Sequence, residues 1–277
     1  MSDLVLYEVV DERIAVITLN RPEKANSQTP ELLDLLDECW TRAARDRSVR
    51  VIVLKANGKH FSAGHDIAAS NEKDGPGGGM KPGFADWQGR GLQAIYEWET
   101  ERYLGYTRRW RDVPKPSIAA VQGQCIAGGL MLCWPCDLII AADNAKFSDP
   151  VVRMGIGCVE YHAHTWEVGP RKAKEWLFTA KSFTAEEAEN LGMVNRVVPL
   201  AELESYAMEL AREIAQMHPF ALAQAKRAVN HTMDIQGFYN SLQSVFDIHQ
   251  VGHGNALTVS SYPILVNLDQ MKDSIKK

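Results

Sequence analysis

Short apolar runs, separated by polar breaks, dominate the first half of the chain. Residues 7–10 and 14–19 are two such runs, and the polar residues 11–13 between them are typical of a hairpin turn. Three further runs occur at residues 51–54, 117–121 and 138–141. Runs of this length that alternate with helical segments are typical of buried parallel strands. The pattern therefore predicts an α/β fold with a mostly parallel sheet.

Apolar residues recur at helical spacing in the longer segments. Thr29 is suited to cap a helix that begins at Pro30, because its side-chain oxygen can accept an unpaired N–H and proline fits the first turn. Residues 96–111 are expected to form a second helix, whose aromatic side chains face the core or a pocket wall. The first half therefore alternates strands with helices.

The helical pattern dominates after residue 169. Thr184 and Glu187 have the spacing of a capping box, and Gly192 is suited to end the helix that follows them. A brief strand is expected at residues 194–198. Amphipathic helices are then expected at residues 203–217, 220–230 and 235–250.

Composition and charge limit the class of protein. The chain has 277 residues, 45% of them hydrophobic, so it can bury a large core. Its net charge of −5 argues against a nucleic-acid partner, which usually requires a basic surface. Residues 128–142, the most apolar stretch, are too short to span a bilayer and contain Asp137, so no membrane partner is expected. The first ten residues lack the apolar segment of a signal peptide, and we expect a cytoplasmic protein.

The cysteines and histidines suggest neither a disulfide framework nor a metal site. The chain has five cysteines, an odd and scattered set that fits a reduced compartment. Cys133 and Cys136 have the spacing of a redox motif, but their place late in an apolar run favours a buried structural role. His162 and His164 lie two residues apart without a third ligand at a suitable spacing, so no metal is expected.

Two loops carry the clearest chemical signal. One spans residues 61–67 and reads Phe-Ser-Ala-Gly-His-Asp-Ile, and the other spans residues 122–129 and ends in Ala-Gly-Gly. Each contains small residues that can expose a backbone N–H. Two N–H groups that converge on one oxygen stabilise the negative charge that develops there, which is an oxyanion hole. The chain is therefore a candidate for chemistry on a carbonyl or thioester.

With several further segments, these loops resemble the crotonase superfamily, also called the enoyl-CoA hydratase/isomerase family. The segments that carry the resemblance are residues 20–26, 61–66, 114–123, 127–129, 136–137, 145–147 and 188–194. Each segment is a weak signal alone. Their order and spacing over residues 5–255 make the resemblance specific.

The resemblance implies a fold, a substrate class and an assembly. The fold would be an α/β, crotonase-like spiral of ββα units over residues 1–199, followed by a helical C-terminal trimerisation region over residues 200–277. The protein would bind acyl-CoA thioesters and form a homotrimer or a dimer of trimers. Coenzyme A would be part of the substrate, and no separate cofactor is expected.

The resemblance also implies roles for particular residues. The backbone N–H groups of His65 and Gly128 would be the two oxyanion donors, and Gly128 would open a helix whose dipole adds to the field at the oxygen. Lys24, Ala25 and Ala63 would lie along the CoA moiety. Further residues expected to contact the substrate are Ile67, Met131, Tyr161 and His162.

The chain departs from the family at the acid/base positions. Hydratases of the family resemble one another in two glutamates, which position water and move protons at the substrate double bond. Met131 and Val151 occupy those positions here. Glu160 lies near the place where other branches carry an active-site acid, and it is the expected replacement. Glu97 and Glu101 share a helix face and are alternatives, although a solvated face explains their spacing as well.

Three functions are consistent with these residues. The favoured hypothesis is an enoyl-CoA hydratase or isomerase, a lyase before an isomerase, that uses Glu160 as its acid/base. The second is an acyl-CoA hydrolase, which needs an oxyanion hole and an activated water but no pair of glutamates. The third is a non-catalytic acyl-CoA-binding protein, which the loss of both glutamates would permit.

Overall fold

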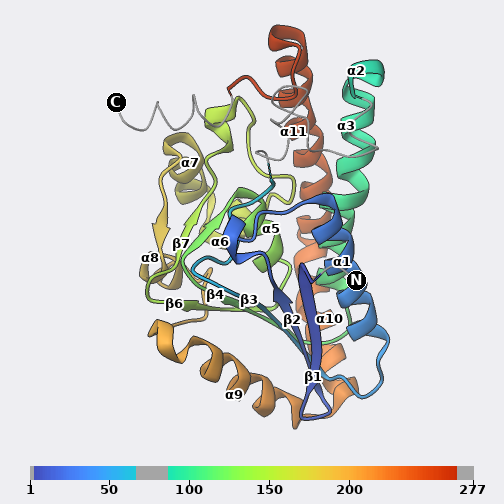
Figure 1. Ribbon diagram of the computed structural model, residues 1–277, viewed down its shortest axis with the longest axis vertical. Coiled ribbons are helices and arrows are strands. Elements are labelled where there is room, and N and C mark those ends of the chain that lie inside the picture. Colours follow the sequence, from blue (N-terminus) through green and yellow to red (C-terminus); the bar gives the residue numbers. More distant parts are fainter. Residues whose placement is uncertain (1–2, 67–86, 267–277) are drawn as a thin grey trace.

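A six-stranded sheet lies at the centre of the computed structural model, which describes residues 3–66 and 87–266 (Figure 1). Its strands, in spatial order, are β1 (Val5–Val10), β2 (Ile14–Leu19), β3 (Val51–Ala56), β4 (Ser117–Val121), β6 (Leu138–Ala142) and β9 (Arg196–Val198). The hairpin of β1 and β2 is antiparallel, and every other neighbouring pair is parallel. The prediction of a mostly parallel sheet is confirmed.

A second, smaller sheet was not predicted. It contains β5 (Gln124–Ile126), β7 (Lys146–Ser148) and β8 (Phe183–Thr184), in that order. The chain passes from β4 to β5 and later from β6 to β7, so successive turns place one strand in each sheet. This alternation is the spiral of ββα units that the resemblance implied. Strands of two or three residues are too short to show the period-2 pattern on which strand prediction depends.

The two faces of the large sheet bury alternate residues of each strand, as the pleat requires. On one face, Val16, Val53 and Ala120 pack with Ala207 and Ala211 of α9 (Leu203–Ala215). This helix runs along the lower edge of the molecule in Figure 1. The other face belongs to the larger core cluster, which includes most of the buried aromatic side chains. The cavity described below lies on that side.

The remaining helices include those predicted from the sequence, together with shorter helical segments that were not. They are α1 (Pro30–Arg45), α2 (Trp87–Arg90), α3 (Leu92–Glu99), α4 (Tyr106–Asp112), α5 (Leu130–Cys133), α6 (His164–Val168), α7 (Pro170–Thr179), α8 (Ala185–Asn190), α10 (Pro219–Ile235) and α11 (Phe238–Ser260). Short 3₁₀ turns occur at Pro22–Lys24, Ala127–Gly129, Val151–Met154 and Leu200–Glu202. A π-helical segment, Thr100–Gly105, interrupts the helix predicted at 96–111.

The predicted caps are present. The Thr29 side chain accepts the N–H of Leu32 at 3.2 Å at the start of α1. Thr184 and Glu187 form both hydrogen bonds of the capping box at α8. These caps satisfy N–H groups that a helix leaves unpaired in its first turn, so the local sequence fixes where both helices begin.

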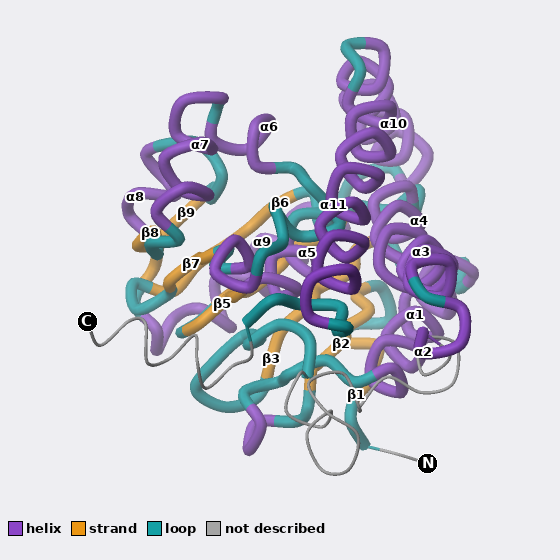
Figure 2. The backbone as a smooth tube through the Cα atoms, turned by 90° about the horizontal axis from the view of Figure 1, so that it is seen from above, coloured by secondary structure: helices purple, strands orange, loops and turns teal. Residues whose placement is uncertain are grey.

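The long C-terminal helix α11 runs beside α3 and α10 (Figures 1 and 2). It continues to Ser260, ten residues beyond the predicted end at 250. None of the helices within residues 3–66 and 87–266 is long and apolar enough to cross a membrane. The division of the chain at residue 199 stays a prediction.

Candidate active site

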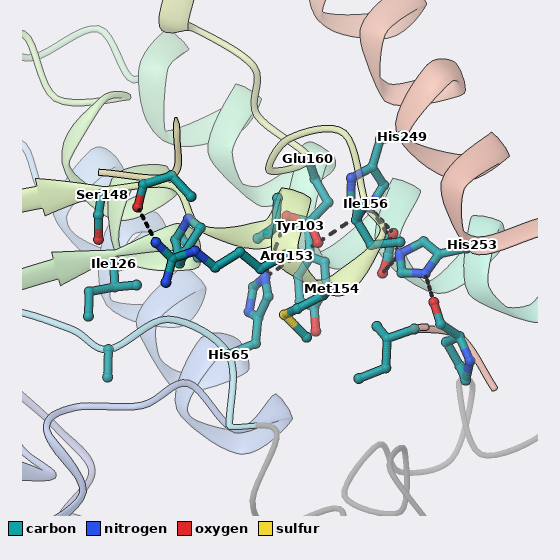
Figure 3. A pocket seen from close by; sticks show the side chains of 18 of the residues that line it. His65, Tyr103, Ile126, Ser148, Arg153, Met154, Ile156, Glu160, His249 and His253 are labelled. Carbon is teal, nitrogen blue, oxygen red and sulfur yellow. Dashed lines mark hydrogen bonds and ion pairs between the residues drawn. The ribbon is translucent and has the colours of Figure 1, made fainter. Parts of the chain in front are cut away.

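A cavity of about 750 Å³ lies between the small sheet, the segment before Glu160, the helices around residue 100, and α11 (Figure 3). Its polar lining residues are His65, Glu99, Tyr103, Gln124, Ser148, Arg153, Glu160, Lys181, Ser182, His249 and His253. Its apolar lining residues include Ala63, Ile126, Ala127, Val151, Met154, Ile156 and Ile264. The cavity therefore combines an apolar wall with several groups that can carry charge.

The two loops singled out in the sequence lie side by side. The N–H of Ser62 donates to the carbonyl of Gln124 at 3.1 Å, and the N–H of Ile126 donates to the carbonyl of Ser62 at 3.0 Å. Gly64 has a φ of +86°, and a Cβ atom there would lie 2.7 Å from the carbonyl oxygen of Ile126. Glycine is thus required at this position both by the backbone conformation and by the close approach of the second loop.

The backbone of His65 is oriented by its pairing with Gln28. The N–H of Gln28 donates to the carbonyl of Gly64 at 2.8 Å, and the N–H of Asp66 donates to the carbonyl of Gln28 at 3.0 Å. In a parallel bridge of this kind, the N–H of the residue between the two bonded groups points the other way. The N–H of His65 is therefore directed away from Gln28.

Gly128 lies against His65. A Cβ atom on Gly128 would be 2.8 Å from Cε1 of His65 and 2.9 Å from Oε1 of Gln28. Gly128 belongs to the 3₁₀ turn Ala127–Gly129, whose first N–H groups have no acceptor within the turn. The helix that follows, α5, has only four residues, so the dipole expected behind Gly128 is that of a short helix. The geometry permits two neighbouring N–H donors, and their role as an oxyanion hole stays a prediction.

Glu160 enters the cavity, as its predicted role requires. Glu160 is 5% exposed, and its carboxylate lies 3.4 Å from Nε2 of His65. The His65 ring stacks on Tyr103 with a centroid separation of 4.0 Å and an interplanar angle of 11°. Burial, followed by the nearby carboxylates of Glu99 and Glu160, raises the pKa of Tyr103 well above its ordinary value. Tyr103 therefore stays protonated and supports the His65 ring by stacking.

The segment before Glu160 is fixed by Asp149, which is completely buried. One carboxylate oxygen of Asp149 accepts the N–H of Val159 at 3.1 Å and lies 3.0 Å from Nε2 of His164. The buried carboxylate of Asp149 thus accepts the backbone N–H groups of Val151 and Val159 and has the His164 ring beside it. This arrangement holds the peptide next to Glu160 and so sets the position of its carboxylate.

A second polar cluster, formed by Glu99, His249 and His253, was missed by the sequence analysis. Nε2 of His249 lies 3.3 Å from Oε2 of Glu99, and Nε2 of His253 lies 3.5 Å from Oε1 of the same carboxylate. Burial alone would lower the pKa of His249, but its hydrogen bond to Glu99 and the charge of Glu160 raise that pKa to about 9. The spacing of the two histidines, four residues apart, was the available signal, but the predicted helix ended before His253.

The alternative acids Glu97 and Glu101 face solvent. Glu97 pairs with Arg90 and accepts a hydrogen bond from Gln93 at 2.8 Å, and Glu101 pairs with Arg102 at 3.3 Å. Glu99 lies between them in sequence and points to the opposite side, because two residues turn a helix by about 200°. The interpretation that a solvated face explains the spacing of Glu97 and Glu101 is confirmed.

Three of the predicted substrate contacts lie away from the cavity. Met131 is buried in the core. Tyr161 is also buried and packs edge-on against Phe238, with ring centroids 6.2 Å apart. His162 packs against His164, with centroids 4.5 Å apart. None of the three is among the described residues that line the cavity, and their contact with substrate stays a prediction. The orientation of successive residues explains why Tyr161 and His162 do not line the cavity, since Glu160 faces the cavity and the residues that follow it turn into the core.

The other residues predicted to contact the substrate are Lys24, Ala25, Ala63 and Ile67. Ala63 lines the cavity, and its N–H donates to the carbonyl of Ala25 at 2.9 Å. Lys24 is exposed beside Ala25, so these three residues form one continuous surface. Ile67 lies outside the described residues. Val151, at the second vacant glutamate position, lines the cavity.

Arg153 and Lys181 also line the cavity and were not predicted. Arg153 donates to the carbonyl of Ala180 at 3.4 Å (Figure 3).

The cysteines are free thiols, and burial raises the pKa of both Cys133 and Cys136 well above the ordinary value. High thiol pKa values suppress reactivity, which favours the structural interpretation of this pair.

Comparison with known proteins identifies the family. The description of the matching family is enoyl-CoA hydratase/isomerase, and the match covers residues 10–245. A crystal structure of a "probable enoyl-CoA hydratase" from Mycobacterium smegmatis is 63% identical, with a TM-score of 0.86 over 95% of this chain and 99% of that chain. A second such structure, from Mycobacterium thermoresistibile, is 62% identical, with a TM-score of 0.86 over 95% of this chain and 100% of that chain.

A curated relative agrees with these structures. "Putative enoyl-CoA hydratase EchA13" from Mycobacterium tuberculosis is 41% identical over 261 residues, which are 91% of this chain and 81% of that protein. The family match covers most of the chain, and the fold is the spiral that the family shares. The chain therefore belongs to the enoyl-CoA hydratase/isomerase family, within the crotonase superfamily.

Proposed function

We propose that this protein is an acyl-CoA enzyme that stabilises a thioester enolate, with hydration of an enoyl-CoA as its reaction. The N–H groups of His65 and Gly128 hold the enolate oxygen, and Glu160 transfers the proton. The observation that carries this proposal is the position of the Glu160 carboxylate, which lies in the cavity that His65 lines, while Gly128 lies directly against His65. A proton-transfer group and an oxygen-binding group are thus available to one substrate.

The energetics support this arrangement. The α-proton of a thioester is too weakly acidic for an ordinary carboxylate to remove unless the enolate is stabilised. In other enzymes, one donor of an oxyanion hole lowers the barrier by about 2.7–4 kcal/mol. Two donors here would make proton transfer at the α-carbon accessible to Glu160.

One carboxylate is sufficient for the proton balance of hydration. The attacking water gives its oxygen to the β-carbon and loses a proton, while the α-carbon gains one. Glu160 can accept the proton from water and deliver it to the adjacent carbon, so the net change is addition of one water. The apolar residues Met131 and Val151 then have no part in the proton transfer.

The surface formed by Lys24, Ala25 and Ala63 is the proposed path of the CoA moiety. Ala63 both lines the cavity and is hydrogen bonded to Ala25, so a thioester held at His65 has a continuous route along this edge. Lys24 is exposed and can pair with a phosphate of CoA. The free thiols fit the cytoplasmic location that we propose.

A homotrimer, or a dimer of trimers, is the proposed assembly. In the described monomer, α10 buries none of its residues, and Phe220, Val229 and Ile235 on this helix are largely exposed. A helix that buries none of its residues and exposes large apolar side chains is available to pack against another chain. Light scattering of the purified protein tests this proposal: a mass of three or six chains supports it, and a monomer contradicts it.

The reaction is tested by mass spectrometry of an enoyl-CoA panel incubated with the protein in deuterated water. The panel holds short, long, branched and ring-bearing acyl groups. A product heavier by one water is the expected result. Deuterium uptake without added water indicates isomerisation or enolisation, and free CoA indicates the hydrolase. If a panel member binds and no member of the panel reacts, this result contradicts the enzymatic proposal and favours the non-catalytic acyl-CoA-binding protein.

A further inference from the structure

The cluster of Glu99, His249 and His253 has the geometry of a metal site. We propose that these three residues bind a divalent transition metal ion at one end of the acyl cavity, with Zn²⁺ the best suited. The spacing of residues in the sequence had predicted no metal site. Only the packing of α11 against α3 brings the three side chains together.

The distances between the ligand groups are close to those of tetrahedral coordination. The two Nε2 atoms of His249 and His253 are 3.0 Å apart, and they lie 3.3 and 3.5 Å from the two oxygens of Glu99. Bonds of about 2.0–2.1 Å from a tetrahedral Zn²⁺ place neighbouring ligand atoms roughly 3.3–3.4 Å apart. The three groups can therefore bind one ion with only small shifts of their side chains.

The hydrogen bonds of the two imidazole rings determine which nitrogen of each ring has a lone pair available to a metal ion. Nδ1 of His249 lies 2.6 Å from the carbonyl oxygen of Cys158, and Nδ1 of His253 lies 2.6 Å from that of Pro263. A carbonyl oxygen only accepts, so both Nδ1 atoms carry hydrogen. In the neutral rings, both Nε2 lone pairs then point toward each other.

Two lone pairs at 3.0 Å repel unless a cation lies between them. The cation is either an added proton or a metal ion. An Nδ1–H bond to a backbone carbonyl is the usual support of a metal-binding histidine, because it fixes the tautomer and the ring orientation. Both histidines have this support, so both Nε2 atoms are oriented for a metal ion.

The charge of the site also favours a cation. Glu99 is only 2% exposed, and Nε2 of Gln250 donates to it at 2.5 Å. A positive partner, in addition to hydrogen bonds, stabilises a buried carboxylate. The Glu160 carboxylate lies 3.7 Å from Nε2 of His249 and adds negative charge on the same side.

The three proposed ligands lie on two helices, α3 and α11. His249 and His253 are one turn apart on one face of α11, a common spacing for paired metal ligands. Glu99 is the last residue of α3 and immediately precedes the π-helical segment Thr100–Gly105. Such segments are frequent at functional sites.

All three residues line the cavity, so a fourth coordination position would be accessible from it. Three protein ligands and one open position are typical of zinc sites that act on a bound molecule rather than of purely structural sites. The open position would take water or an oxygen atom of the acyl group. The proposed ion is thus separate from the backbone donors at His65 and Gly128.

The proposal is tested with the full-length protein after treatment with a chelator and removal of the chelator. Titration with Co²⁺ alone, followed by visible absorption, is expected to give one ion per chain with the intense bands of tetrahedral Co²⁺, and Zn²⁺ is expected to displace it. Glu99→Gln and His253→Gln should each weaken Co²⁺ binding by at least about 100-fold, because each removes one of three ligands. His218→Ala and His231→Ala, which remove exposed histidines elsewhere, are the matched controls and should bind as the wild type does.

Circular dichroism establishes that each variant is folded, and Glu99→Gln preserves shape if His253→Gln does not fold. Absence of stoichiometric Co²⁺ and Zn²⁺ binding by the wild type would overturn the proposal and leave a shared proton between the histidines. Binding that Glu99→Gln and His253→Gln leave unchanged would overturn it as well. Because metal binding is measured without turnover, its outcome is independent of the proposed hydration.

Discussion

The Glu160 carboxylate lies 3.4 Å from Nε2 of His65, although the two residues are 95 positions apart in the chain. The contact joins the loop after β3 to the segment after β7. It places the proposed proton-transfer group beside the residue whose backbone N–H is the proposed oxygen donor. Because of this contact, the proposed proton-transfer group and the proposed oxygen donor can act on the same thioester in this cavity.

Replacement of Glu160 by Gln is expected to reduce turnover by about 10²–10⁴-fold, since the amide cannot exchange a proton while its shape is unchanged. The affinity for the CoA ester should stay within about threefold, because the oxyanion donors and the CoA surface are intact. Steady-state kinetics and calorimetric titration of the substrate measure the two quantities. Glu97→Gln, on the solvent face of α3, is the control and should leave both unchanged. Wild-type turnover in Glu160→Gln would remove Glu160 from the mechanism.

Replacement of Gly128 by Ala is expected to lower kcat by about 10²–10³-fold, the usual effect of losing one oxyanion donor. The added methyl would lie 2.8 Å from Cε1 of His65 and 2.9 Å from Oε1 of Gln28, so it displaces the donor region. Gly157→Ala adds a methyl where no atom lies within 4 Å, and it should be nearly neutral. Equal rates for both variants would contradict the role of Gly128.

Replacement of Gly64 by Ala is expected to lower the free energy of unfolding by at least about 2 kcal/mol. The variant has both a positive φ and a methyl 2.7 Å from the Ile126 carbonyl oxygen. Gly192→Ala has a similar φ of +84° with no atom within 4 Å, so it isolates the conformational cost of about 1 kcal/mol. Urea unfolding of both variants measures the difference. If Gly64→Ala were no less stable than Gly192→Ala, the close approach of the two loops would be refuted.

The stability of the protein should depend on pH through His162. Burial, and then the neighbouring His164, lower the pKa of His162 to about 3 from the ordinary value of 6.5. Between these values the unfolded chain binds a proton at this ring and the folded protein does not. The contribution to the free energy of unfolding therefore falls as the pH decreases from about 6.5 toward 3.

His162→Asn removes this dependence. The stability of the variant relative to the wild type should rise as the pH falls from about 7 to about 5, as measured by urea midpoints at each pH. His231→Asn, at an exposed position of α10, should show no such trend. A constant difference between His162→Asn and the wild type would mean that the ring is protonated equally in both states.

Local sequence was sufficient wherever a local interaction decides the structure. The cap at Thr29 and the capping box at Thr184 depend on residues within one turn, and both were predicted correctly. The alternation of strands and helices gave the parallel sheet for the same reason. The strands β5, β7 and β8 were missed, because two or three residues form a strand only when neighbouring segments supply the hydrogen bonds.

The sequence by itself determined the family and the two loops, because motif order and spacing are properties of the chain, and the family resemblance pointed to Glu160 as the expected acid. Only the tertiary structure decided that Glu99 meets His249 and His253 and that Tyr161 and His162 turn away from the cavity. Contacts between distant residues depend on how helices pack and on the register of a segment, and a shift of one residue changes which side chain faces the cavity. Glu99 could not be distinguished from Glu97 and Glu101 as a site residue until the structure showed α11 packed against α3.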